Sequence, residues 1–319
     1  MEMEAEEDMM NTAIVSKSMA VVACTAMTVV YVAILYAPTL ILQLPPPTSY
    51  KQFMIRRFCC AAVSSLLSLL VSSALLLPIR RWNISNALAL YGVRADHVWR
   101  TLVLPFSLTS LMYMGSLVKS ILLLDLWKEV GSESTAYNYI CTAFLKMYGL
   151  MISYASNITA WRNLVVAPIT EEIVFRACMI PLLLCGGFKS QAVIFICPVF
   201  FSLAHLNHLL EFYIRKDCSL LKTSLAVGTQ LAYTMVFGSY ASFLFLRTGH
   251  LVAPLVAHIV CNYMGLPALY SGRKGVLVIL AFLAGCGAFL RLLFRLTDPT
   301  LFNSNTDNCR CWHGYCSWI

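Results

Sequence analysis

Long apolar runs dominate the chain, and polar or proline-rich segments separate them. A run of about twenty apolar residues can cross a bilayer as a helix, because each helical residue adds about 1.5 Å and the hydrocarbon is about 30 Å thick. The pattern predicts helices over 19–42, 58–77, 102–124, 140–156, 164–184, 192–210, 225–246, 251–266 and 276–293. Because the run at 140–156 is only moderately apolar, we expect an all-α bundle of about eight membrane helices.

Composition agrees with a membrane protein. Of the 319 residues, 59% are hydrophobic and only 12% are charged, whereas soluble domains are nearer a quarter charged. This leaves almost no room for a separate soluble domain. The excess of 23 basic over 15 acidic residues suits loops that face anionic lipid headgroups, and we expect no nucleic-acid partner.

The two ends of the chain differ from its centre. We expect an acidic N-terminal tail over 1–17, a transmembrane domain over 18–296 and a Cys-rich tail over 297–319. Most of the 13 cysteines fall inside apolar runs, where they are expected to pack as small hydrophobic residues. The tail contains Cys309, Cys311, His313 and Cys316, for which zinc binding, palmitoylation and disulfide pairing all remain open.

The segment at 164–184 contains Glu171, Glu172 and Arg176. Ionisable groups at membrane depth are costly, so they indicate a functional site by default. Glu172 and Arg176 are four residues apart and can pair on one helical face, while Glu171 points about 100° away. One carboxylate would then be held by the arginine and the other would be available for chemistry. The alternative is a purely structural ion pair.

Two further apolar segments contain polar pairs. His205 and His208 are three residues apart, and His258 and Asn262 are four residues apart, so each pair shares a helical face. The alternative for these residues is interhelical hydrogen bonding without catalysis. His97 and His250 fall in predicted loops, where we expect them to be solvated.

Several chemistries fit these residues. Glu171 and His205 could activate a water molecule, with His258 and Asn262 donating hydrogen bonds to the developing oxyanion. Metal binding by the Glu and His side chains is an alternative, although the His-Glu-x-x-His helix of zinc proteases is absent from the sequence. A proton-coupled transporter is a second alternative, because buried Glu, Arg and His also form proton relays. No particular Cys is paired with a base, which disfavours a Cys nucleophile.

Three motifs follow one another on the predicted helices: Glu171-Glu172-x-x-x-Arg176, Phe201-x-x-x-His205 and His258-x-x-x-Asn262. In this order they resemble the CPBP family of intramembrane proteases, and within it the type II CAAX prenyl endopeptidases. The resemblance covers nearly the whole chain. The N-terminal region and the Cys-rich tail resemble plant members most.

The resemblance implies a multi-pass protease of the endoplasmic reticulum membrane. It would remove the last three residues from farnesylated or geranylgeranylated CAAX proteins, such as small GTPases, within the lipid bilayer. The resemblance assigns water activation to Glu171 and His205 and oxyanion stabilisation to His258 and Asn262. It assigns support of the site to Glu172 and Arg176. It also implies a glutamate-dependent enzyme with no metal or other cofactor.

Overall fold

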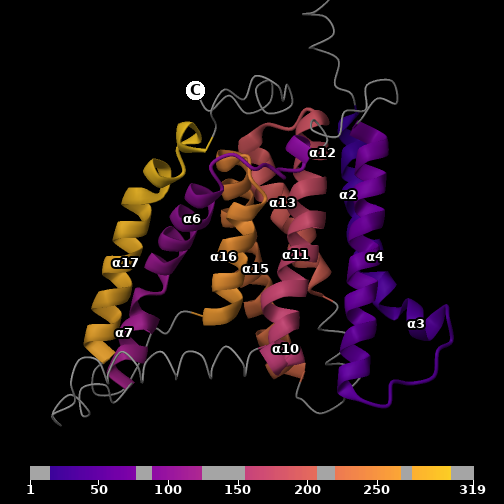
Figure 1. The fold of residues 1–319 in the computed structure, drawn as a ribbon, viewed down its shortest axis with the longest axis horizontal. Coiled ribbons are helices and arrows are strands. Elements are labelled where there is room, and N and C mark those ends of the chain that lie inside the picture. The colour runs from indigo at the N-terminus through magenta and orange to yellow at the C-terminus, as the bar shows by residue number, and fades with distance from the viewer. Residues whose placement is uncertain (1–14, 77–87, 124–154, 207–219, 267–274, 303–319) are drawn as a thin grey trace, which may run out of the picture. The chain divides into compact units, whose positions relative to one another are not determined.

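A computed structural model describes residues 15–76, 88–123, 155–206, 220–266 and 275–302 (Figure 1). Every regular element among these residues is a helix, which confirms the predicted all-α class. All but the last two residues of the segment predicted at 140–156 lie outside the described residues, as do His208 and the cysteines of the C-terminal tail. The predicted tail and domain boundaries stay predictions.

Three of the described helical segments are long and apolar enough to cross a membrane. They are Lys17–Leu40, Tyr50–Leu76 and Gly275–Leu296. A fourth span would come from α6 (Val98–Met112) and α7 (Met114–Leu123), which are bent by 76° where they meet. The expected total of about eight spans stays a prediction.

The described chain divides into two compact units. The first unit contains residues up to Leu102, Ile169–Leu255 and the residues from Asp298 onward. The second unit contains Val103–Pro168 and Val256–Thr297.

The first unit is a cluster of helices that pack against one another. Its main helices are α2 (Lys17–Ala33), α4 (Tyr50–Leu76), α12 (Met179–Cys185), α13 (Ser190–Ala204) and α15 (Leu220–Thr248). Helix α2 packs against α4, α12 and α13, and α13 packs along α15 (Figure 1). The α13–α15 contact is close because Gly238 has no side chain. A Cβ atom at Gly238 would lie 2.9 Å from the Cβ atom of Pro198.

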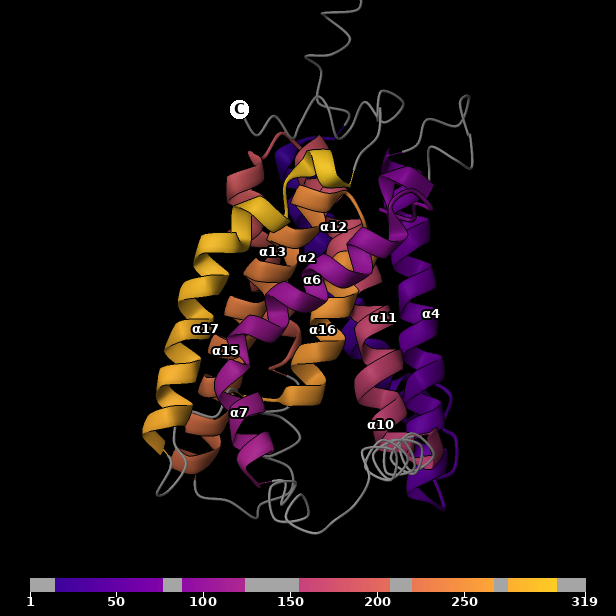
Figure 2. The ribbon, with the colours of Figure 1, turned by 60° about the vertical axis from the view of Figure 1, so that its left-hand side comes forward.

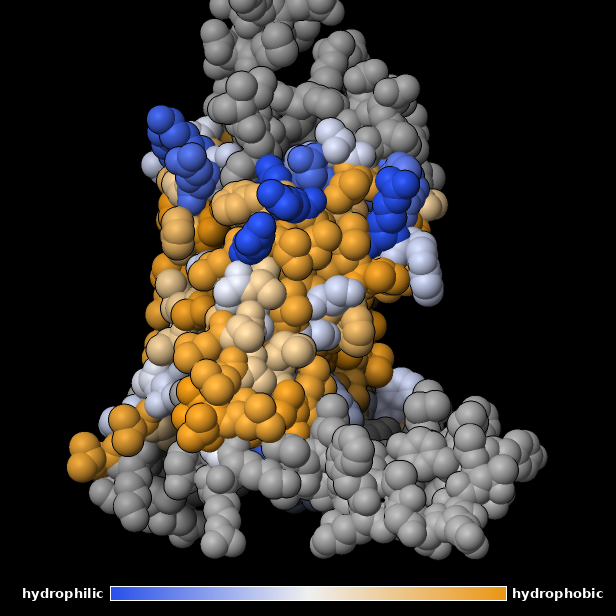
Figure 3. Space-filling model, turned by 90° about the vertical axis from the view of Figure 1, so that its left-hand side faces the viewer, coloured by the Kyte–Doolittle hydropathy of each residue, from blue (hydrophilic) through white to orange (hydrophobic). Residues whose placement is uncertain are grey.

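Helix α4 buries small polar residues and exposes large apolar ones. Its buried residues include four serines, Ser64, Ser65, Ser68 and Ser72. Leu66 and Leu70 on the same helix are 60% and 64% exposed. This distribution suits a helix in lipid, where small and hydroxyl-bearing residues favour close helix contacts and apolar side chains face the acyl chains. Figure 3 shows apolar side chains over most of the described surface that it views.

In the second unit, α7 lies alongside α17 (Gly275–Leu296) (Figure 2). The prediction of one continuous helix over 102–124 is wrong, because the chain turns at Tyr113. The Tyr113 hydroxyl donates a hydrogen bond to the carbonyl oxygen of Gly265 at 3.0 Å, which holds the turn. Gly285 of α17 allows the close approach, since a Cβ atom there would meet Met114 at 2.9 Å.

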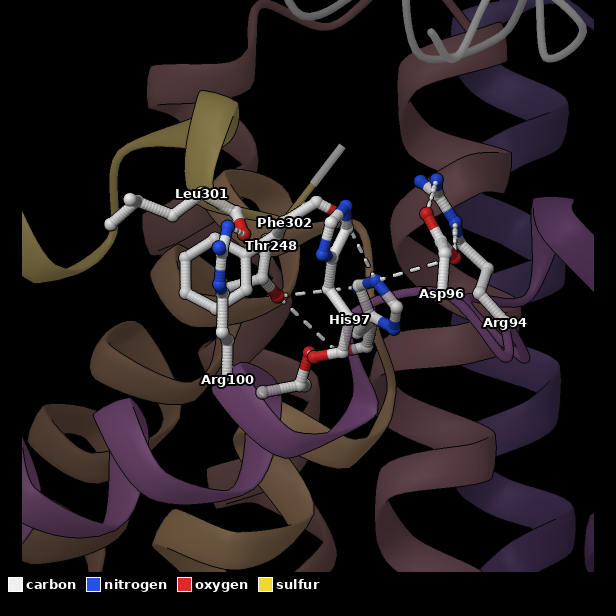
Figure 4. A network of polar contacts seen from close by, with 9 residues as sticks. Arg94, Asp96, His97, Arg100, Thr248, Leu301 and Phe302 are labelled. Atoms are coloured by element: carbon white, nitrogen blue, oxygen red, sulfur yellow. Dashed lines mark hydrogen bonds and ion pairs between the residues drawn. The ribbon is translucent and has the colours of Figure 1, made fainter. Parts of the chain in front are cut away.

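A polar network joins three connecting segments of the first unit (Figure 4). Arg94 pairs with Asp96 at 2.5 Å, and Asp96 lies 3.7 Å from Nε2 of His250. Nε2 of His250 lies 3.4 Å from the carbonyl oxygen of Phe302, and Arg100 donates to the carbonyl oxygen of Leu301 at 3.2 Å. The segment that follows α17 is thereby tied to the first turn of α6 and to the turn after α15.

The network corrects one sequence expectation. His250 was expected to be solvated in a loop, but its exposed fraction is 0%. Burial lowers the pKa of His250, and nearby Arg94 lowers it further, which together outweigh the opposing effect of Asp96. For Asp96, burial by itself raises the pKa, but the hydrogen bond and charge of Arg94 prevail and leave the pKa below its usual value.

Candidate active site

The first motif lies on a helical run that changes type four times between Ile158 and Cys185. The run comprises α10 (Ile158–Trp161), η3 (Arg162–Val166), α11 (Ala167–Glu172), η4 (Ile173–Cys178) and α12 (Met179–Cys185), and η3 and η4 are π-helices. Asn157 caps its start by accepting a hydrogen bond from the backbone N–H of Thr159 at 2.9 Å. The sequence predicted a plain helix over 164–184, so the run is longer and less regular than expected. Short π-helical turns inside α-helices are frequent at functional sites.

Glu172 and Arg176 form the buried pair that their spacing predicts. Nη1 of Arg176 lies 3.0 Å from Oε1 of Glu172, and the exposed fraction of both side chains is 0%. The Arg176 guanidinium also lies 4.4 Å from the ring centroid of Phe201 and 5.7 Å from that of Phe237. A carboxylate and two aromatic rings therefore offset the cost of burying this cation.

His205 occupies the position directly after α13, where its ring is held in one orientation. Its Nδ1 lies 2.8 Å from the carbonyl oxygen of Phe201, and its ring meets the Phe201 ring edge-to-face at 4.8 Å between centroids. Because a carbonyl oxygen can only accept, Nδ1 carries the proton. In the neutral ring, Nε2 is then the unprotonated nitrogen, which is the form that a general base needs.

The expected helix over 192–210 is therefore wrong at its C-terminal end, because α13 stops at Ala204. The backbone N–H of His205 donates to Ser202 and that of Leu206 donates to Leu203, each over three residues rather than four. Such tightening is common in the last turn of a helix. His205 is thus the C-capping residue of α13, and the predicted helical face that it shares with His208 stays a prediction.

Glu171 is partly exposed, unlike its neighbour Glu172. The residue before it, Thr170, is buried, and its Oγ1 lies 3.2 Å from the hydroxyl of Tyr31 on α2. The Tyr31 hydroxyl also interacts electrostatically with the Glu171 carboxylate. These contacts lie within the first unit.

Neighbouring helices supply hydrogen-bond donors to three carbonyl groups of the motif run. Ser65 of α4 donates to the carbonyl oxygen of Thr170 at 3.3 Å, and Ser72 donates to that of Cys178 at 3.4 Å. The Cys197 thiol of α13 donates to the carbonyl oxygen of Phe175 at 2.7 Å. Because π-helical turns shift the regular backbone hydrogen bonds, these donors stabilise the irregular part of the run.

The third motif lies in the second unit, on α16 (Val252–Met264). His258 is 4% exposed, whereas Asn262 one turn later is exposed. Nδ2 of Asn262 donates a hydrogen bond to the carbonyl oxygen of Asn163 in η3 at 2.8 Å. This contact orients an amide that, by its chemistry, can donate to an oxyanion.

Four of the six expected site residues lie in the first unit, namely Glu171, Glu172, Arg176 and His205; His258 and Asn262 lie in the second. The assembly of all six into one site stays a prediction, as do their catalytic roles. In the part of the chain that the structure describes, no three His, Cys, Asp or Glu side chains are grouped so that they could hold a metal ion.

Comparison with known proteins identifies the family. A family model described as type II CAAX prenyl endopeptidase Rce1-like matches residues 153–264, which include all three motifs. A protein named CAAX prenyl protease 2 from Arabidopsis thaliana is 56% identical over 305 residues, which cover 95% of this chain and 97% of that protein. The chain belongs to the type II CAAX prenyl endopeptidase family. The resemblance inferred from the motifs, including its plant-like character, is confirmed.

More distant members of the family also match. CAAX prenyl protease 2 from Homo sapiens is 37% identical over 229 residues, covering 69% of this chain and 64% of the human protein. Its counterpart from Caenorhabditis elegans is 31% identical over 246 residues, covering 75% of this chain and 84% of the nematode protein. No solved structure matches the chain significantly.

Sequence reasoning missed several residues around the motifs of this family member. They are Tyr31 on α2, Ser65 and Ser72 on α4, Cys197 on α13 and Phe237 on α15. The four serines of α4 recur at spacings of one helical face, which is a signal that could have been found. Tyr31 and Phe237 have no such signal, because an aromatic residue in an apolar run is unremarkable.

Proposed function

We propose that this chain is an intramembrane endopeptidase that removes the last three residues from prenylated CAAX proteins. Membership of the type II CAAX prenyl endopeptidase family supports this, as does the end-to-end similarity to the protein named CAAX prenyl protease 2. The observation that carries the catalytic assignment is the difference between two adjacent carboxylates. Glu172 is fully buried against Arg176, whereas Glu171 is partly exposed, and we assign the contact with the attacking water to Glu171.

In the proposed reaction, Glu171 and Nε2 of His205 both accept hydrogen bonds from a water molecule, and Glu171 takes its proton as the water oxygen attacks the scissile carbonyl carbon. His258 and Asn262 donate hydrogen bonds to the resulting oxyanion. Collapse of this intermediate breaks the C–N bond, and the proton passes to the departing amine of the tripeptide. Glu172 and Arg176 hold the helix that carries Glu171 and serve as support.

The proposed substrate fits a site among membrane helices. A prenyl chain favours the bilayer by about 0.8 kcal/mol for each buried CH₂ group, which delivers the attached peptide bond to the membrane. We propose farnesylated or geranylgeranylated CAAX proteins of the small GTPase type as substrates, and the membrane of the endoplasmic reticulum as the location.

The decisive variant is Glu171→Gln, which keeps the side-chain shape and removes the base. Release of the tripeptide from a farnesylated CAAX peptide, measured with purified protein in detergent, should fall by about 10²- to 10⁴-fold. Asp298→Asn is the matched control, since it makes the same change at a carboxylate that caps η6 outside the motifs. Wild-type activity in Glu171→Gln would overturn the assignment.

Activity measured in the presence of a chelator distinguishes the glutamate mechanism from a metal-dependent one. Under the proposal, wild-type activity is unchanged after incubation with EDTA or 1,10-phenanthroline. Loss of activity that added zinc restores would replace the glutamate mechanism with a metalloprotease at the same residues.

A further inference from the structure

We propose that Tyr31 is a positioning residue for Glu171 and acts through the hydroxyl of Thr170. The inference deepens the proposed function and rests on it, because it assumes that Glu171 is the base. Tyr31 lies on the first described helix, 139 positions from Thr170 along the chain. None of the three motifs includes either residue.

The contact is a buried hydrogen bond at the residue that directly precedes Glu171. The Tyr31 hydroxyl lies 3.2 Å from Oγ1 of Thr170, and the two residues are 9% and 6% exposed. The carbonyl oxygen of Thr170 meanwhile accepts from Ser65 on α4. Two different helices therefore hold Thr170, one through its side chain and one through its backbone. Little freedom remains for the backbone from which the Glu171 side chain departs.

The ring of Tyr31 also contacts the residues that orient His205. It meets the Phe175 ring edge-to-face at 5.5 Å between centroids, and Phe175 meets Phe201 in the same way at 5.2 Å. Phe201 in turn contacts His205 through both its ring and its carbonyl oxygen. Tyr31 thus begins a row of rings, Tyr31–Phe175–Phe201–His205, that links the two groups proposed to activate water.

Packing alone does not explain why residue 31 is a tyrosine with a hydroxyl group. A phenylalanine would fill the same space, and a hydroxyl in an apolar interior is unfavourable unless it is hydrogen-bonded. This hydroxyl hydrogen-bonds Oγ1 of Thr170, the residue next to Glu171, and it also interacts electrostatically with the Glu171 carboxylate. Arg57 and Glu172 are the other charged groups that act on this hydroxyl.

The test compares Tyr31→Phe with Tyr91→Phe. Tyr91 is the matched control because it is 8% exposed and its hydroxyl donates to Ser72, away from Glu171. Displacing a catalytic group slightly lowers turnover more than affinity, so kcat of Tyr31→Phe should fall about tenfold with KM unchanged. Tyr91→Phe should keep kcat within about twofold of wild type, and both variants should unfold at the same temperature. Equal kcat values for the two variants would overturn the inference, as would a tenfold loss that comes with a raised KM and a lower unfolding temperature.

A double-mutant cycle tests whether Tyr31 acts through Thr170. Thr170→Ser keeps the hydroxyl and should retain activity, whereas Thr170→Val should lose about as much as Tyr31→Phe. The double variant Tyr31→Phe/Thr170→Val should lose no more than the worse single variant, because both remove one interaction. If the fold-loss of activity in the double variant equals the product of the two single losses, the two hydroxyls act separately and the inference is overturned.

The Glu171→Gln variant distinguishes a failure of the proposed function from a failure of the positioning role of Tyr31. If Glu171→Gln remains active, the proposed function itself is wrong. If Glu171→Gln is inactive and Tyr31→Phe behaves like Tyr91→Phe, only the role of Tyr31 is wrong.

Discussion

The Arg176 guanidinium lies over the ring of Phe201, 4.4 Å from its centroid, and this contact couples the buried ion pair to the candidate base His205. The same Phe201 ring meets the imidazole of His205, and the Phe201 carbonyl accepts its Nδ1 proton. Arg176 therefore reaches two of the three motifs, since it also binds Glu172. A change at any of these groups is expected to affect the others.

Arg176→Met should destabilise the protein, because it leaves the Glu172 carboxylate buried without its cation. Breaking a buried pair in this way costs about 3–5 kcal/mol, whereas replacing both partners by apolar groups is often neutral. The double variant Glu172→Leu/Arg176→Met should therefore unfold at a higher temperature than Arg176→Met in a thermal melt in detergent. A double variant less stable than the single one would contradict this account of the pair.

Phe201→Leu should lower peptidase activity more than Phe237→Leu. Both remove an aromatic ring beside Arg176, at 4.4 Å and 5.7 Å, but only Phe201 also contacts the imidazole of His205. The cation–π contact is worth about 0.5–2 kcal/mol, and Leu keeps most of the apolar volume. Initial rates on a farnesylated CAAX peptide would measure the difference, and equal losses in the two variants would count against a role in orienting His205.

Gly238→Ala should destabilise the protein, while Gly228→Ala on the same helix should not. A Cβ atom at Gly238 would lie 2.9 Å from the Cβ atom of Pro198, whereas a Cβ atom at Gly228 would have none of the described atoms within 4 Å apart from its adjacent residues and its own helix backbone. Overpacking costs about 1–3 kcal/mol, and replacing an unhindered helical glycine gains about 0.5–1 kcal/mol. Unfolding temperatures of the two variants should therefore move in opposite directions from wild type, and a shift in the same direction would refute the close α13–α15 contact.

His250 should make stability depend on pH near neutrality. Burial lowers its pKa in the folded state from the ordinary value of 6.5, so the unfolded chain binds the proton more tightly. Stability is then full above the unfolded pKa and declines as pH falls from that value toward the lowered folded pKa. His250→Gln should flatten this part of the profile of unfolding temperature against pH. A variant whose profile remains as steep as that of wild type would assign the dependence to another group.

The spacing of residues within one segment predicted the features that depend only on residues close together in the sequence. The Glu172–Arg176 pair follows from a separation of four residues, and the placement of His258 and Asn262 on one helix follows in the same way. The order of the three motifs was specific enough to identify the family.

Features that depend on the surroundings of a residue were not predictable in this way. The end of α13 at Ala204 depends on backbone hydrogen bonds in its last turn, and carbonyl groups of the π-helix η4 accept hydrogen bonds from donors on α4 and α13. The burial of His250 depends on Phe302, which is 52 positions further along the chain. A hydrophobicity pattern describes one segment at a time, so it contains no information about such partners.

The buried serines of α4 fix the register between this helix and the helical run that contains the first motif. Ser65 and Ser72 are two helical turns apart, about 10.5 Å along the axis. Their acceptors are the carbonyl groups of Thr170, which precedes the π-helix η4, and of Cys178, its last residue. Apolar helix contacts in lipid tolerate small shifts, because one methyl group replaces another at little cost. Two hydrogen bonds at different positions along the helix axis instead fix the register of the two segments, because a shift of one turn breaks both bonds. In hydrocarbon no water replaces the lost hydrogen bonds. The position of the π-helix η4 along α4 is thereby set by two hydroxyl groups.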